Sequence, residues 1–165
     1  RLIDRLRDRE GEVRLDHLLA GRLHTRIGKL GSGGDLDHML STIRAFPDFR
    51  LFAGTERYLL DVLEAGGAGC ITATANVTCA LAAEIYRRRQ REDVHEEQAY
   101  LTAVRGALEA FPLVAALKYL MAEATDQAAW LHLRPPLTAL SQAQASALQE
   151  ALERLRFQVP FVGVE

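Results

Sequence analysis

The sequence has little of what marks several large classes of protein. Its two cysteines, Cys70 and Cys79, are too few for a disulfide framework and suit a reducing cytosol. No apolar run reaches the roughly 18 residues of a membrane span. Twenty Lys and Arg against 22 Asp and Glu leave a net charge of −2, so no basic field points to nucleic acid. We therefore expect a cytoplasmic protein with neither nucleic-acid nor membrane partners.

Metal ligands are also not grouped. No metal-ligand spacing surrounds the cysteines, and the five histidines show no paired spacing on one helix face. We interpret the histidines as surface or capping residues and both cysteines as small core residues. The sequence predicts no metal site and no cofactor.

The length and the apolar content are those of one globular domain. The chain has 165 residues, of which 48% are hydrophobic. A chain of about 150 residues buries roughly 70% of its unfolded surface, so a sizeable core is expected. The sequence begins at Arg1 without Met and shows no signal peptide. We expect from this a trimmed, processed or incomplete chain.

A strand-like run, a Gly-rich or polar turn and an amphipathic helix follow one another three times. Strands alternating with helices indicate βα units and a parallel sheet. A spacing of about 20–25 residues per unit suits a (β/α) barrel. The expected strands are residues 23–30, 49–53 and 69–74, and the expected helices that follow them are residues 36–45, 56–65 and 77–89.

After Arg89 only helices are expected, over residues 92–110, 113–124 and 141–155, with Ser141 as the cap of the last one. The chain then divides into a tail or linker (1–12), βα units preceded by a helix over 13–20 (13–91), and a helical extension (92–165). A complete eight-stranded barrel needs about 250 residues, and three parallel strands cannot close one. We expect a missing N-terminal half or a second copy of the chain to cover the sheet.

Lys29 is the sharpest candidate for chemistry, because active sites of parallel βα folds lie at the carboxyl ends of the strands. A lysine with the usual pKa of about 10.4 is less than about 0.1% neutral at pH 7. Burial lowers that pKa and frees the amine to attack a keto group. The iminium that results is an electron sink for making or breaking the adjacent carbon–carbon bond. The alternative is a surface lysine at a strand end.

Two other strand ends, residues 54–56 and 71–76, also qualify, and a glycine-rich loop follows Lys29. Gly31-Ser-Gly-Gly34 would let backbone N–H groups approach an anion at a helix start, although it is not a phosphate loop of the Walker type. The alternative is a turn in which Asp35 caps the next helix. We expect Asn76 to cap the helix after the third strand.

At these same residues the sequence resembles the dihydrodipicolinate synthase/N-acetylneuraminate lyase superfamily, from about residue 11 to residue 155. The strand-six lysine motif of that family appears as Ile27-Gly-Lys-Leu-Gly-Ser-Gly-Gly-Asp35. The next strand and turn appear as Phe49-Arg-Leu-Phe-Ala-Gly-Thr-Glu56, and the following motif as Gly66-Gly-Ala-Gly-Cys-Ile-Thr-Ala-Thr-Ala-Asn-Val77. Leu117-Lys-Tyr-Leu120 and Arg134-Pro-Pro-Leu137 match the helical block.

The resemblance implies the C-terminal part of a TIM barrel, about three βα units, followed by a helical extension. It implies a Schiff-base (class I) aldolase or lyase acting on pyruvate or another 2-oxo acid, with Lys29 as the Schiff-base lysine. Gly54 and Ile71 match positions that line the substrate pocket, and Gly31 and Ser32 fall in the loop after the lysine. Family members are often dimers or tetramers.

The sequence departs from the family pattern in three places. The loop after Lys29 is one residue longer than usual and lacks the Asp that usually follows the lysine. Residues 1–10 hold neither the tyrosine nor the proline of the family's proton-relay segment, and the family's carboxylate-binding motif is absent. These departures favour an alternative, a catalytically inactive half-barrel that serves as an assembly or binding subunit. A phosphate- or sugar-binding module using Gly31–Gly34 is a third hypothesis.

Overall fold

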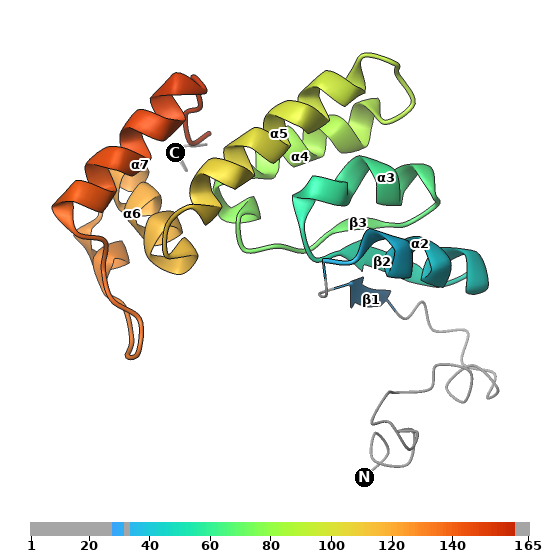
Figure 1. The fold of residues 1–165 in the computed structure, drawn as a ribbon, viewed down its shortest axis with the longest axis horizontal. Helices are drawn as coiled ribbons and strands as arrows, with labels where there is room; N and C mark the ends of the chain where they lie inside the picture. The colour runs from blue at the N-terminus through green and yellow to red at the C-terminus, as the bar shows by residue number, and fades with distance from the viewer. Residues whose placement is uncertain (1–27, 32–33, 161–165) are drawn as a thin grey trace, which may run out of the picture.

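A parallel sheet lies at the N-terminal side of the fold (Figure 1). The computed structural model describes residues 28–31 and 34–160, so the expected tail over 1–12 and helix over 13–20 lie outside the described residues. Within them the sheet has the order β1-β2-β3, formed by Gly28–Gly31, Arg50–Ala53 and Gly69–Cys70. Both neighbouring pairs are parallel, which confirms the parallel sheet predicted from the alternating pattern.

The helices that follow the strands agree with the predicted periodicity. Helix α2 (Leu36–Ala45) has the predicted bounds, and the side chain of Asp35 accepts a hydrogen bond from the backbone N–H of His38 at 3.0 Å. The second predicted helix begins instead as a 3-10 turn, η2 (Glu56–Tyr58), and continues as α3 (Leu59–Glu64). Helix α4 (Ala75–Arg88) completes the third unit.

The C-terminal part of the described chain is helical, as the sequence predicts. It contains α5 (Val94–Glu109), α6 (Leu113–Thr125) and α7 (Gln142–Arg154). Ser141 caps α7 in a capping box, which confirms that prediction. A short 3-10 helix, η3 (Ala128–Leu131), was not predicted.

Helix α5 joins two of the three clusters of buried residues in the described chain. One cluster of buried residues packs α2 and α3 on β2 and includes Met39, Leu51 and Val62. A second cluster packs α3, α4 and α5 together around Leu101. A third packs α4, α5, α6 and α7 around Leu108. Because α5 contributes to the last two clusters, the helical block packs directly against the βα units (Figure 1).

Three local predictions are wrong. The third strand ends at Cys70 rather than at residue 74, because the side chains of Thr72 and Thr74 bond to Glu56 in a loop. Asn76 does not cap α4: it lies in the first turn, and its side chain donates to the carbonyl of Ala73 at 2.7 Å. Cys79 is exposed rather than buried.

No single helix within residues 34–160 is long and apolar enough to cross a membrane. Helices α5 and α6 reach the length and apolar content of a membrane span only when they are taken together, and they are bent by 106° at their junction.

Candidate active site

The strand that carries Lys29 lies at one edge of the described sheet. Lys29 is the second residue of β1, and its backbone pairs in register with Leu51 of β2. Gly31 ends β1 and pairs with Ala53, the last residue of β2. The register therefore brings the carboxyl ends of β1 and β2 together, as the sequence predicts for the candidate site. Ser32 lies outside the described residues.

The other two candidate pocket residues lie at the same carboxyl end of the sheet. Gly54 follows the last residue of β2, and Ile71 follows the last residue of β3. The backbone N–H of Ile71 donates to the carbonyl of Ala53 at 2.9 Å, which ties the two strand ends together. The Ile71 side chain is 56% exposed in this chain. Gly54 and Ile71, which are 17 positions apart in the sequence, thus directly follow the ends of neighbouring strands.

A cleft of about 340 Å³ opens beside Gly54. Two guanidinium groups, from Arg57 and Arg105, reach its wall and both pair with the carboxylate of Glu109. The Arg105–Glu109 contact is 2.9 Å long. The cleft is lined by Gly34, Gly54, Thr55, Arg57, Tyr58, Arg105 and Glu109.

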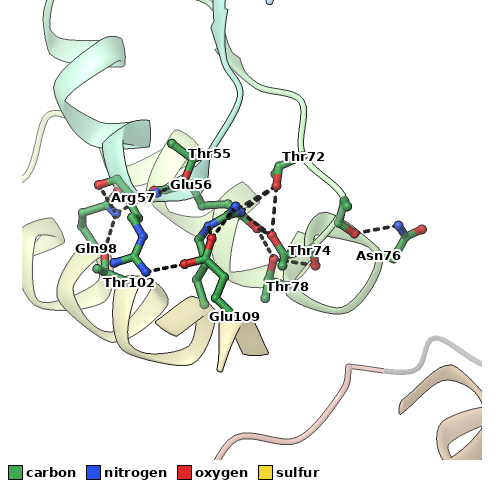
Figure 2. A network of polar contacts seen from close by, with 12 residues as sticks. Thr55, Glu56, Arg57, Thr72, Thr74, Asn76, Thr78, Gln98, Thr102 and Glu109 are labelled. Carbon is green, nitrogen blue, oxygen red and sulfur yellow. Dashed lines mark hydrogen bonds and ion pairs between the residues drawn. The ribbon is translucent and has the colours of Figure 1, made fainter. Parts of the chain in front are cut away.

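Behind the cleft lies a fully buried carboxylate, that of Glu56, whose exposed fraction is 0%. Three threonine hydroxyls donate to it, as Figure 2 shows. Thr72 Oγ1 lies 3.0 Å from Oε2, Thr78 Oγ1 lies 2.9 Å from Oε1, and Thr74 also donates to Oε1. Both carboxylate oxygens therefore have donors, as a buried charge requires.

The charge of Glu56 is balanced by Arg105, whose side chain is 9% exposed. Arg105 Nη1 donates to Glu56 Oε2 and to the hydroxyls of Thr72 and Thr74, each of these last two at 2.8 Å. Its Nε donates to Glu109 Oε1 at 2.9 Å. The guanidinium thus lies between a buried and a half-exposed carboxylate, and it links α5 to two loops at the end of the sheet.

Burial raises the pKa of Glu56, but the hydrogen bonds from Thr74, its own backbone amide and Thr78, with the charge of Arg105, outweigh burial and lower the pKa below 4.5. Glu56 is therefore ionised at neutral pH. Burial and the neighbouring Glu56 charge raise the pKa of the Cys70 thiol to about 11, so that this thiol stays protonated.

The backbone of Glu56 is held as firmly as its side chain. Gln98 on α5 donates from Nε2 to the Glu56 carbonyl at 2.9 Å, and its Oε1 accepts from the N–H of Leu60 at 3.1 Å. Gln98 and Arg105 are seven residues apart, about two helical turns, so both point from one face of α5. This face of α5 fixes the start of the helix that follows β2.

The Glu56 network holds charge in place and does not resemble a proton-transfer or metal site. A general acid or base needs a pKa near the working pH, and the pKa of Glu56 lies below 4.5. In the part of the chain that the structure describes, no group of three His, Cys, Asp or Glu side chains is placed to hold a metal ion.

Sequence reasoning placed residues 54–56 at a strand end but missed the role of Glu56 and its partner Arg105. One signal was available. Arg105 stands among Leu101, Val104 and Leu108 on the apolar face of its predicted helix, and a buried arginine needs a carboxylate partner. The two threonines Thr72 and Thr74, near the end of the predicted third strand, were a second signal, because their hydroxyls can donate to a buried carboxylate.

Comparison with known proteins places the chain in a family. The model of the dihydrodipicolinate synthetase family matches residues 28–155, which include the strands, the Glu56 network and the helical block. The chain belongs to this family. The resemblance inferred from the lysine motif is thereby confirmed.

Two relatives illustrate the range of the family. An uncharacterized DapA-like lyase of Chloroflexus aurantiacus is 34% identical over 142 residues, 86% of this chain and 47% of the relative. A probable 2-dehydro-3-deoxy-D-pentonate aldolase of Escherichia coli is 34% identical over 99 residues, 56% of this chain and 32% of the relative. The chain thus spans about half the length of the first relative and a third of the second.

The fold is also found in solved structures. N-acetylneuraminate lyase from Fusobacterium nucleatum, complexed with pyruvate, has a TM-score of 0.72 and 20% sequence identity. The similarity covers 88% of this chain and 51% of that lyase. The described part of this family member is therefore a partial α/β fold, equivalent to about half of a larger one.

Proposed function

We propose that Lys29 forms a Schiff base with pyruvate or another 2-oxo acid, in a class I aldolase or lyase similar to dihydrodipicolinate synthase. One observation carries the proposal: Lys29 lies on β1, in register with β2, at the sheet end where Gly31, Gly54 and Ile71 also lie. Family membership and the pyruvate complex of a protein with this fold support it.

The chemistry needs an amine next to a group that binds the substrate. The neutral amine of Lys29 adds to the C2 carbonyl of the 2-oxo acid to give a carbinolamine, and protonation of its hydroxyl with loss of water leaves an iminium. Loss of a proton from C3 then gives an enamine, which adds to an aldehyde carbonyl and forms the new carbon–carbon bond. Cleavage is the same sequence in reverse, and water finally releases Lys29. Gly31, Ser32, Gly54 and Ile71 are the proposed substrate-binding residues.

The proposal extends to the rest of the protein. The chain forms the C-terminal part of a (β/α)8 barrel, with βα units over residues 13–91 and a helical extension over 92–165. The N-terminal half of the barrel supplies the proton relay and the carboxylate site. The enzyme is cytoplasmic, assembles as a dimer or tetramer, and needs no cofactor, because the iminium formed at Lys29 is the electron sink.

Borohydride trapping tests the proposal directly, because peptide analysis distinguishes Lys29 from Lys118, the other lysine of these 165 residues. The protein at its native length is incubated with pyruvate and sodium borohydride, and its peptides are analysed by mass spectrometry. A reduced pyruvyl adduct is expected on the Lys29 peptide. Lys29→Arg should abolish it, whereas Lys118→Arg, which alters a lysine that donates to the carbonyl of His132, should retain it.

Absence of the adduct from the unmodified sequence would overturn the proposal. It would favour the second candidate, a catalytically inactive half-barrel that acts as an assembly or binding subunit. The lack of a tyrosine and a proline in residues 1–10, where the resemblance implies the family's proton-relay segment, favours that candidate. Sedimentation distinguishes it further, since a stable monomer of this chain is incompatible with an assembly subunit.

A further inference from the structure

We propose that Glu56, acting through Arg105, is a positioning residue that holds the two loops carrying Gly54 and Ile71 in the arrangement that binds substrate. The inference rests on the proposed function, because Gly54 and Ile71 are its candidate pocket residues. It adds a role for the helical block, which reaches the site through one face of α5.

The geometry places Glu56 between the two loops. Glu56 lies two residues after Gly54, and Thr72 is the residue after Ile71. The hydrogen bond from Thr72 to Glu56 therefore joins the loop after β2 to the loop after β3 close to both candidate residues. Thr74 and Thr78 add two further links from the second loop and from the start of α4 (Figure 2).

Helix α5 also holds Glu56, through two of its side chains. Arg105 donates to Glu56 and to both loop threonines, and Gln98 donates to the Glu56 carbonyl. One carboxylate thus receives donors from the loop after β3, from α4 and from α5. A glutamine at position 56 would keep the volume of the glutamate side chain but would lose the negative charge that faces Arg105. The loops would then be held by weaker, neutral hydrogen bonds.

Two readouts separate positioning from mere stability. The first is hydrogen exchange of the Ile71 amide, which donates to Ala53, measured on peptides of the protein at its native length. The second is the pyruvate concentration that half-saturates borohydride trapping at Lys29, compared with the trapping rate at saturation. A purely structural role would not change the half-saturating concentration in variants that remain folded.

Glu56→Gln is the first variant, and it should raise Ile71 amide exchange and the half-saturating pyruvate concentration each by about tenfold. The trapping rate at saturation should change by less than about twofold, because Lys29 itself is unaltered. Thr72→Val is a milder variant at a half-buried position and should act in the same direction. Thr72→Ser, which keeps the hydroxyl, should restore both values.

The matched control is Glu97→Gln. Glu97, on α5, is also a glutamate paired with an arginine, Arg88 of α4, but it lies near the start of α5, two turns before Arg105. Removal of the Glu97 charge should leave the exchange rate of the Ile71 amide and the half-saturating pyruvate concentration unchanged.

The outcomes separate the two proposals. If the Glu56→Gln and Thr72→Val proteins fold and their Ile71 amide exchange is unchanged, the positioning role is overturned, whether or not the half-saturating pyruvate concentration changes. Faster exchange with an unchanged half-saturating concentration would overturn it too, since the loops would then not serve binding. If the unaltered protein forms no adduct at Lys29, the proposed function fails, and the exchange data alone still decide whether Glu56 holds the loops.

Discussion

Glu56 and Arg105, 49 residues apart in the sequence, form an ion pair in which the carboxylate is fully buried. The pair joins the end of the parallel sheet to the fourth turn of α5. Such a pair adds little net stability compared with an apolar replacement of both partners, but removing one partner typically costs about 3–5 kcal/mol. The pair lies beside the candidate pocket, so its main effect is to position the loops that follow β2 and β3.

Acid should weaken the fold partly through Glu56. The folded-state pKa of this carboxyl is lowered from 4.5, so the unfolded chain binds its proton first as the pH falls. The linked stability is fully present above about pH 4.5 and is lost as the pH falls through the lowered folded-state pKa. The stability advantage of the native sequence over Glu56→Gln, measured by urea unfolding, should therefore be smaller at about pH 3 than at about pH 6. An advantage that does not vary with pH contradicts this assignment.

Truncating Leu101 tests the contact between α5 and the βα units. Leu101 is fully buried in the cluster that also contains Leu59 and Ile85. Leu101→Ala should lower the free energy of unfolding by about 2–5 kcal/mol, because it leaves a cavity. Leu131→Ala, at a side chain that is 43% exposed, is the control and should change it by less than about 0.5 kcal/mol. Similar losses in the two variants would mean that this cluster does not hold the parts together.

Two glycine substitutions should act in opposite directions. A Cβ at Gly67 would lie 2.3 Å from Val62 Cγ1 and 2.7 Å from the Val62 carbonyl oxygen, so Gly67→Ala must displace backbone and lower the Tm. A Cβ at Gly106 in α5 would meet nothing closer than Arg57 Nη2 at 3.9 Å. Gly106→Ala should therefore stabilise by about 0.5–1 kcal/mol through helix propensity. Thermal unfolding followed by circular dichroism measures both, and a rise in Tm for Gly67→Ala would refute the clash.

The capping box of α7 should contribute measurably. The Ser141 hydroxyl accepts from the N–H of Gln144 at 3.3 Å, and the Gln144 side chain accepts from the Ser141 N–H at 2.9 Å. Ser141→Ala should cost about 1 kcal/mol in urea unfolding, and Ser141→Thr should retain most of the stability. Equal stabilities of the Ala and Thr variants would show that the cap is dispensable.

Local signals account for the predictions that agree with the structure. Helix α2 was bounded correctly because its start is marked by a capping aspartate, Asp35, and its length by an apolar periodicity, both of which are short-range. The cap of α7 at Ser141 was found for the same reason. The parallel direction of the strands follows from the alternation of strands and helices, and the lysine motif indicates the family.

Predictions failed where a distant residue competes with a local preference. The sequence predicts Asn76 as the cap of the helix after the third strand, but the N-cap residue is Thr74, whose hydroxyl donates to Glu56 and makes no capping bond. The predicted third strand stops at Cys70, because Thr72 and Thr74 are drawn to the same carboxylate. Neither outcome is visible in the local sequence, because the attracting charge lies at least 16 residues away.

The sequence by itself determined the succession of elements, the family, and Lys29 as the residue to test, since each depends on patterns within a few tens of residues. Only the tertiary structure decided that Glu56 is the centre of a buried network and that Arg105 is its partner. The physical reason is that the two charges meet through the packing of α5 against the sheet end. Burial then requires that every oxygen and every charge find a partner there.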